Sequence, residues 1–251
     1  MTDGRELHDR TRRHYDELVP DLERGYIDYR WKSGPVQRSH YRHTRVAIER
    51  ALGDIGHVRT LLEVGVGPGT WTDLCLDRAD HVTVCDLSVQ MLEQARERLG
   101  SRVEYVHGDF LSDEVPVSGP YDIVASFRAI EYMDDKESFV ARCRARLAEG
   151  GSLVVVTKNP GWRDRHRSDA QDVDEIHRHW IHWTDLMMLL ADRGFDEITC
   201  RPVAVGSYRW PFGHRVGVAL SDLWWRLIEG RSMRRSWDSL VESYLVLAEK
   251  R

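Results

Sequence analysis

Short, nearly continuous apolar runs alternate with amphipathic stretches through the middle of the chain. Continuous runs of this kind are typical of strands that are buried on both faces of a parallel sheet. The stretches between them repeat their apolar residues with helical spacing. The pattern therefore predicts alternating strands and helices, with the strands over residues 60–64, 81–86, 102–107, 121–127 and 152–157.

Capping residues mark where three of the intervening helices begin. Ser88, the pair Asp134 and Glu137, and Thr184 each stand just before a helical pattern. Side-chain oxygens at such positions accept hydrogen bonds from the unpaired N–H groups of the first helical turn. We expect these helices to cover residues 89–99, to reach residue 147 ahead of the terminator Gly150-Gly151, and to cover residues 185–193.

The first 55 residues differ from the alternating part. They predict two helices, over residues 5–18 and about 36–52, on either side of an aromatic, turn-rich segment. No internal repeat or low-complexity linker separates them from the alternating strands and helices. We therefore expect a single domain over residues 1–251 in which residues 1–55 form a helical cap.

The last part of the chain contains two further segments, residues 195–205 and 243–248, that predict strands. A helical insert lies between them at residues 211–230 and has a broad apolar face. Three interpretations of this face remain open: packing on the core, dimerisation, or a lid over a hydrophobic substrate. A peripheral membrane contact is a fourth hypothesis, because Trp and Arg residues flank the face. Monomer and homodimer both remain open.

Composition and charge narrow the class of protein. Of the 251 residues, 41% are hydrophobic and 31% charged, which is typical of a globular protein. The net charge of −5 gives no general positive field, so we expect no nucleic-acid partner. The four cysteines form no C-x-x-C pair, which favours reduced thiols. With neither a signal-peptide pattern nor a bilayer-length apolar stretch, we expect a cytoplasmic protein.

The most informative segment is the sequence LLEVGVGPGTWT at residues 61–72, where a predicted strand runs into three glycines and then a helix. Glycines allow tight turns and a close approach of the backbone to a ligand, and a helix N-terminus favours negative ligand groups. The spacing of Gly65, Gly67 and Gly69 is G-x-G-x-G, one residue shorter than the dinucleotide fingerprint. An ordinary glycine turn without a ligand is the alternative.

Two aspartates follow the next two predicted strands. Asp86 closes the second strand, where a carboxylate can accept hydrogen bonds from ribose hydroxyls. Asp109 follows the third strand, where a carboxylate can accept the amino proton of adenine while Phe110 packs on the ring. The alternatives are a helix-leading acid at Asp86 and a turn aspartate at Asp109.

Five segments in order resemble the class I S-adenosylmethionine (SAM)-dependent methyltransferases, and most of all their ubiquinone/menaquinone-biosynthesis-like small-molecule subgroup. These segments are LLEVGVGPGTWT, VCDLS, HGDF, YDIVASFRAIEYM and GGSLVVVTKNP, within about residues 60–159. The resemblance implies a doubly wound, seven-stranded, mostly parallel Rossmann-like α/β sheet with an antiparallel last strand. It also implies a SAM-binding core over residues 56–160 and substrate-side segments over residues 161–251.

The resemblance also assigns candidate binding residues. For SAM and its product S-adenosylhomocysteine (SAH) they are Glu63, Gly65, Gly67, Gly69, Asp86, Leu87, Asp109, Phe110, Ser126 and Arg128. Candidate substrate contacts are Tyr29, Trp31, Tyr132 and His179. For the aromatic residues of the N-terminal cap, simple packing against the sheet is the alternative.

A methyl group leaves SAM by in-line displacement, so the protein mainly orients the nucleophile and excludes water. A general base is needed only for a hydroxyl or a protonated amine, and His182 is our first candidate, with a surface or capping histidine as the alternative. We expect no metal site. Of His177, His179 and His182, only the last two share a helix face, and no cysteine or clear carboxylate set completes a metal shell.

The resulting functional hypothesis is methyl transfer from SAM to O, N or C of a small-molecule acceptor, with hydrophobic compounds and natural-product intermediates among the candidates. Two alternatives remain: an NAD-dependent oxidoreductase and a catalytically silent SAM-binding module. The short glycine spacing and Asp109 argue against the oxidoreductase. The complete set of predicted cofactor residues argues against loss of binding, although it does not establish turnover.

Overall fold

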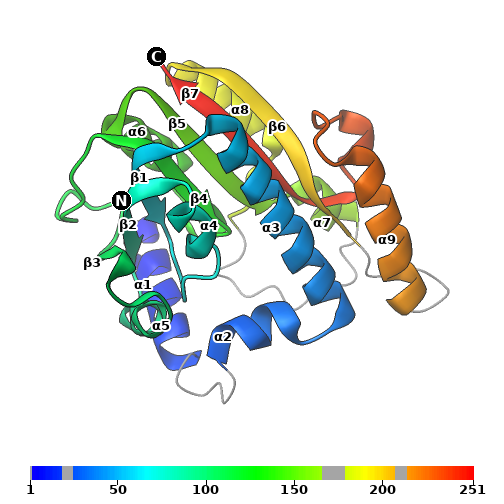
Figure 1. The fold of residues 1–251 in the computed structure, drawn as a ribbon, viewed down its shortest axis with the longest axis horizontal. Helices are drawn as coiled ribbons and strands as arrows, with labels where there is room; N and C mark the ends of the chain where they lie inside the picture. Colours follow the sequence, from blue (N-terminus) through cyan, green and yellow to red (C-terminus); the bar gives the residue numbers. More distant parts are fainter. Residues whose placement is uncertain (1, 19–24, 166–178, 207–213) are drawn as a thin grey trace.

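The computed structural model describes residues 2–18, 25–165, 179–206 and 214–251. In this part of the chain a seven-stranded sheet runs through the molecule with helices on both faces (Figure 1). The strands are β1 (Val58–Val64), β2 (Ala79–Asp86), β3 (Glu104–His107), β4 (Tyr121–Phe127), β5 (Leu147–Lys158), β6 (Phe195–Val205) and β7 (Val241–Lys250).

The strand order is β3-β2-β1-β4-β5-β7-β6. Neighbouring strands from β3 to β5 are parallel, whereas β7 is antiparallel to both β5 and β6. The predicted fold class, a mostly parallel doubly wound sheet with an antiparallel last strand, is therefore confirmed. The order reverses between β1 and β4, and ligands of open α/β sheets bind beside the carboxyl ends of the strands at such a switch point.

The helical segments are α1 (Thr2–Leu18), α2 (Gly25–Ile27), the π-helix η1 (Asp28–Lys32), α3 (Pro35–Ile55), α4 (Thr72–Leu76), α5 (Val89–Leu99), η2 (Gly100–Arg102), η3 (Ile130–Tyr132), α6 (Lys136–Arg146), α7 (Pro160–Arg165), α8 (Trp183–Asp192), α9 (His214–Ile228) and η6 (Arg235–Trp237). None of the helices within the described residues is both long and apolar enough to cross a membrane.

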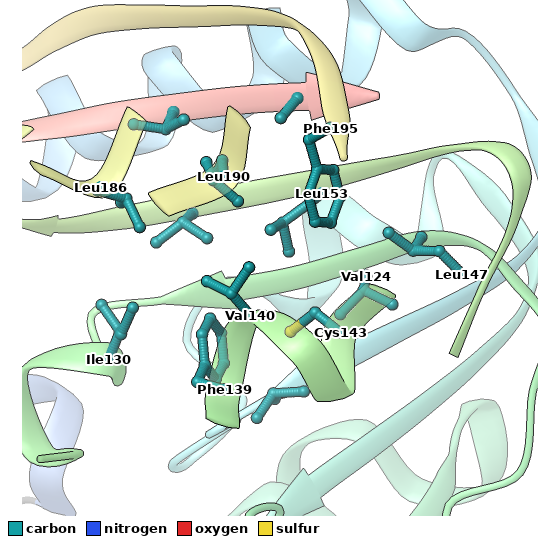
Figure 2. Close-up of a cluster of buried hydrophobic side chains, with 14 of the residues drawn as sticks. Val124, Ile130, Phe139, Val140, Cys143, Leu147, Leu153, Leu186, Leu190 and Phe195 are labelled. Atoms are coloured by element: carbon teal, nitrogen blue, oxygen red, sulfur yellow. The ribbon is translucent and has the colours of Figure 1, made fainter. Parts of the chain in front are cut away.

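Two apolar clusters hold the helices on the two faces of the sheet. Buried side chains of α3, α4 and α5 pack on one face. Those of α6 and α8 pack on the other, and Figure 2 shows this second cluster between α6, α8 and the sheet. Its members there include Phe139, Val140 and Cys143 of α6, Leu186 and Leu190 of α8, and Val124, Leu153 and Phe195 of the strands.

The helix caps confirm one prediction and correct two. Ser88 caps α5, because its Oγ accepts a hydrogen bond from the Met91 N–H at 3.2 Å. Asp135 caps α6 in place of the predicted Asp134, with its carboxylate accepting from the Ser138 N–H at 2.8 Å. His182 caps α8 in place of Thr184, since its ring accepts from the Thr184 N–H. In both corrected cases the capping residue directly precedes the helix, so an N–H group of the first helical turn can reach its side chain.

The end of α6 also differs from the prediction. The helix ends at Arg146, and Leu147 already pairs with Tyr121 of β4, so Gly150-Gly151 lie inside β5 and do not terminate a helix. The next pair is Ile123 with Ser152, which leaves residues 148–151 as an excursion from the ladder. Gly150 has a φ of +74°, a conformation that glycine adopts without strain.

The segment predicted to be turn-rich is helical, as α2 and η1. The ring of Trp31 in η1 is 4% exposed and lies 5.1 Å from the Trp71 ring and 6.1 Å from the Tyr41 ring, measured between centroids. Aromatic packing against α3 and against the loop that contains Gly65, Gly67 and Gly69 therefore stabilises the helical structure of a segment whose local sequence predicts turns.

The predicted insert contains α9, which lies against α3 (Figure 1). Asp222 of α9 contacts Ser39, Arg42 and His43 of α3, and the His43 ring stacks on Trp225 at 4.2 Å. Packing on the body of the protein is thus part of its role. Four apolar side chains of α9 remain exposed: Val216, Leu223, Trp224 and Leu227. The lid, dimer and membrane interpretations of this face stay predictions.

Candidate functional site

A cavity opens at the carboxyl edge of the sheet, where β1, β2 and β4 end, and α1 and η1 contribute its outer walls. Including its mouth and the open space there, it encloses about 990 Å³. The sequence-predicted residues that line it are Gly65, Gly67, Asp86, Leu87, Asp109, Phe110, Arg128, Trp31 and Tyr132. The structure does not place Glu63, Gly69, Ser126, Tyr29, His179 or His182 on its walls.

The glycine loop between β1 and α4 depends on its glycines. Gly65, Gly67 and Gly69 have φ values of +72°, +54° and +73°, in the left-handed region. The Gly65 N–H donates to the Cys85 carbonyl at 2.8 Å, which ties the loop to the end of β2. A Cβ at Gly65 would overlap the Cβ of Ala129, and one at Gly69 would press on Leu99. The loop therefore approaches the segment after β4 at Gly65 and α5 at Gly69, with no room for a side chain at either position.

Asp86 joins this loop to the start of α5. Its carboxylate accepts hydrogen bonds from the Gly67 N–H at 2.7 Å and from the Ser88 N–H at 2.9 Å. Burial raises the pKa of Asp86, and these N–H groups oppose the rise. The carboxylate thus lies on the cavity wall, held by backbone donors, with lone pairs available for a ligand's hydroxyl groups.

Asp109 contacts a residue that sequence reasoning missed. His8 of α1 makes a 2.7 Å hydrogen bond to Asp109 through Nδ1, and the Leu111 N–H donates to the other carboxylate oxygen at 2.8 Å. The bond to Asp109 raises the pKa of His8 against the effect of burial. For Asp109, burial acts to raise the pKa, but the bonds from His8 and Leu111 outweigh it and the pKa is lowered. A second link, from Ser88 Oγ to Asp16 at 2.6 Å, also holds α1 over the cavity.

The pair predicts a pH dependence for the docking of α1. The stability that the His8–Asp109 pair adds to the docking of α1 is fully present below the ordinary histidine pKa of 6.5. It is lost as pH rises through the raised pKa of His8. The lowered pKa of Asp109 sets the acid limit, because protonation of that carboxyl breaks the pair. If the pair contributes about 1 kcal/mol to the docking of α1, the amides of α1 should exchange roughly fivefold faster at pH 8.5 than at pH 6 after correction for intrinsic rates. Hydrogen exchange of His8→Ala should lack this difference, and the same difference in that variant would contradict the assignment.

Glu63 lies at the end of β1 beneath the loop and is fully buried. Its Oε1 has no hydrogen-bond partner among the described residues, and its Oε2 lies 4.0 Å from the Cys75 sulfur. Burial raises the pKa of Glu63 to about 8. The side chain is therefore mostly protonated at neutral pH and does not itself line the cavity.

Arg128 occupies the opposite end of the cavity, just after β4. It has a φ of +64°, unusual for a residue with a side chain, and its guanidinium bonds the Glu242 carboxylate at 3.2 and 3.3 Å. Its Nε lies 3.4 Å from Glu131, which also accepts a 2.8 Å hydrogen bond from Thr157. Glu242 was not predicted, because it is 114 residues from Arg128 and only the insertion of β7 beside β5 brings it there.

The candidate substrate aromatics divide into two groups. Tyr132 lines the cavity and makes an edge contact with Tyr15 of α1 at 5.6 Å, and Trp31 lies beneath the Arg128 guanidinium at 5.8 Å. Tyr29 is 54% exposed and lies off the cavity walls. Tyr132 and Trp31 are therefore the two whose placement fits a ligand contact.

The candidate base His182 has structural partners. Its Nε2 lies 2.9 Å from the Asp238 carboxylate and its Nδ1 lies 2.8 Å from the Thr184 hydroxyl. A role as general base stays a prediction that this placement does not support. Of the other histidines considered, His177 lies outside the described residues. Within the described residues, no cluster of three or more His, Cys, Asp or Glu side chains is arranged to hold a metal ion.

Comparisons with known proteins agree with this geometry. Residues 61–151 match a family model described as a methyltransferase domain. An uncharacterized methyltransferase of Geobacillus thermodenitrificans is 28% identical over 171 residues, which span 62% of this chain and 78% of the relative. The ubiquinone biosynthesis O-methyltransferase of Aromatoleum aromaticum is 30% identical over 119 residues, spanning 46% of this chain and 50% of the relative.

A solved structure of a SAM-dependent methyltransferase from Thermotoga maritima superimposes with a TM-score of 0.64, covering 96% of this chain and 99% of the other at 17% identity, and so supports the fold. The matched segment, the relatives and the fold identify residues 61–151 as part of a class I SAM-dependent methyltransferase domain that uses SAM as its cofactor. The predictions of this enzyme class and of this cofactor are confirmed.

Proposed function

We propose that this chain transfers the methyl group of SAM to O, N or C of a small-molecule acceptor in the cytoplasm. One observation carries the proposal: the glycine loop, Asp86 and Asp109 meet on one cavity at the switch point of the sheet. The cytoplasm is supported by Cys75, Cys85, Cys143 and Cys200, all buried and unpaired with one another. The net charge of −5 favours a small molecule over a nucleic acid.

The walls of the cavity fit the parts of the cofactor. Asp86 would accept the ribose hydroxyls, because its carboxylate is already oriented by two backbone N–H groups. Asp109 would accept the adenine amino group, and Phe110 and Leu87 would pack on the adenosine. Gly65 and Gly67 would let the loop backbone contact the methionine end, which leaves Arg128 and Tyr132 facing the acceptor.

SAM, when bound, supplies a methyl group on a sulfonium that is itself a good leaving group. The protein then orients the acceptor in line and excludes water. Tyr15 and Tyr132 close the cavity on the α1 side, where α1 is held by His8 and Asp16. Arg128 cannot take up a proton at neutral pH, since its two carboxylates raise its pKa further against the effect of burial. Its role would be to fix the shape of the acceptor end.

Calorimetric titration with SAH and, separately, with NADH tests the cofactor. We expect SAH to bind in the micromolar range and NADH not to bind, and the reverse would favour the oxidoreductase. Turnover is tested by incubating the protein with methyl-labelled SAM and fractionated small-molecule extracts. Label in a small-molecule product supports the proposal, whereas SAH binding with no labelled product in any fraction supports the silent binding module.

A further inference from the structure

Two cations, Arg30 and Lys158, have no carboxylate partner among the residues that the structure describes. Arg30 of η1 lines the cavity, whereas Lys158 is not one of the lining residues and stands at the end of β5, the strand next to β4. The two nearby carboxylates, Glu131 and Glu242, both pair with Arg128. In the described part of the chain neither Arg30 nor Lys158 forms an ion pair, although both are partly buried. Partly buried charges without partners are unfavourable, because they lose hydration without compensation.

Aromatic rings hold both cations in place. The Arg30 guanidinium lies 4.6 Å from the centre of the Trp31 ring, and the Lys158 ammonium lies 4.9 Å from that of Trp180. The Arg128 guanidinium lies over the same Trp31 ring, at 5.8 Å, and the Arg128 N–H donates to the carbonyl of Val156, two residues before Lys158, at 2.8 Å. Burial, and then the charges of Arg30 and Arg128, lower the pKa of Lys158 to about 8, which agrees with this arrangement. Cation–π contacts orient these groups but leave their charge unneutralised.

Unsatisfied donors surround Lys158. Ser243 is the register partner of Lys158 on β7, so the two side chains lie on the same face of the sheet. The buried Ser243 hydroxyl has no hydrogen-bond partner among the described residues, and neither has the buried indole N–H of Trp180. Buried polar groups without partners are uncommon in folded proteins. An ammonium, a hydroxyl and an indole N–H can all donate hydrogen bonds, and an anionic acceptor would accept from them and neutralise the ammonium.

We propose that Arg30 and Lys158, with the Ser243 hydroxyl and the Trp180 N–H, form a subsite that binds a carboxylate of the methyl acceptor. The position favours the acceptor over SAM, whose own carboxylate is the other source of this chemistry. Most of the predicted cofactor contacts lie at or after the ends of β1, β2 and β3, and the last two, Ser126 and Arg128, lie at the end of β4, whereas Lys158 ends β5, one strand further along the sheet. This assignment to the acceptor rests on the proposed methyl-transfer function, but the anion subsite itself does not.

The test uses malonate as a carboxylate probe and malonamide as its neutral counterpart, each titrated into SAH-saturated protein and followed by thermal unfolding and calorimetry. We expect malonate to bind and malonamide not to bind. Lys158→Met and Arg30→Gln should each weaken malonate binding about tenfold, the usual size for one lost charge-assisted hydrogen bond. Lys158→Arg should retain binding. The matched controls Lys32→Met and Arg59→Gln remove exposed cations and should leave it unchanged.

A second titration separates the two sources of the carboxylate. SAH is compared with 5′-methylthioadenosine, which lacks the amino-acid portion of SAH. We expect Lys158→Met to bind both as the wild-type protein does. If Lys158→Met and Arg30→Gln lose SAH affinity while 5′-methylthioadenosine binding is unchanged, the subsite holds the cofactor's carboxylate, and the assignment to the acceptor is overturned.

Equal malonate affinity in the wild-type protein, Lys158→Met and Arg30→Gln would overturn the subsite itself. Lys158→Met should unfold at the same temperature as the wild-type protein or higher, because it removes an uncompensated charge, so a loss of binding cannot be attributed to unfolding. If the wild-type protein fails to bind SAH, the proposed function fails. Malonate titrated into the free protein still reports on the subsite in that case.

Discussion

Replacing Asp86 with alanine is expected to weaken SAH binding by about 100-fold or more. The carboxylate would accept the ribose hydroxyls, and it also holds the glycine loop through the Gly67 N–H at 2.7 Å and α5 through the Ser88 N–H at 2.9 Å. Each charge-assisted hydrogen bond contributes roughly 1.5–3 kcal/mol, so losing two of them reaches this factor before the loop relaxes. Calorimetric titration of the wild-type protein and Asp86→Ala with SAH measures the effect.

The control for this experiment lies on the same strand. Asp80 of β2 is exposed and pairs with His57, away from the cavity. Asp80→Ala should therefore bind SAH as the wild-type protein does, while Asp86→Asn, which keeps one acceptor oxygen without the charge, should lie between the extremes. SAH affinities that are equal in Asp86→Ala and Asp80→Ala would show that the cofactor does not bind where we propose.

Features encoded by neighbouring residues could be predicted from the sequence. Strands β4 and β6 begin and end at the predicted residues. Strand β4 is a nearly continuous apolar run, and β6 lies between Gly194 and Gly206, with polar residues in its first half and an apolar end. The glycine loop and the aspartates after β2 and β3 were also predictable. Parallel strands bring their carboxyl ends to one edge, so residues that follow successive strands must lie near one another.

Contacts between distant residues could not be predicted in this way. His8 is 101 residues from Asp109, and Glu242 is 114 residues from Arg128. Nothing in the sequence near either carboxylate distinguishes its partner from the many other basic residues of the chain. The partner is fixed only when α1 packs over the cavity and β7 inserts beside β5.

His182 shows a related limit. Histidine titrates near neutral pH, which made it a reasonable candidate for a base. The same side chain can accept a hydrogen bond at a helix N-terminus, and in the fold it does so for α8 while its other nitrogen faces Asp238. The sequence identified a residue in a special position but could not determine whether that position faces the cavity.

Gly65→Ala is expected to lower the free energy of unfolding by about 3 kcal/mol and to abolish measurable SAH binding. A non-glycine residue at a φ of +72° is strained by roughly 1–3 kcal/mol. The new methyl group would also overlap the Cβ of Ala129, which packs against the loop. Because the loop is tied to Cys85 through the Gly65 N–H, it cannot move aside without losing that bond. For a chain of this size the midpoint of thermal unfolding should fall by about 6–12 °C.

Two companion variants separate the causes of this loss. Gly65→Ala combined with Ala129→Gly removes the overlap but keeps the strained φ, so it should recover about half of the lost stability. Gly53→Ala places a methyl group in α3, where it would make only an ordinary 3.6 Å contact with Arg78, and should raise stability by roughly 0.5–1 kcal/mol. Calorimetric unfolding with SAH titration of all three variants measures these differences. If Gly65→Ala matched Gly53→Ala in stability and SAH affinity, the close approach of the loop to Ala129 would have no part in forming the site.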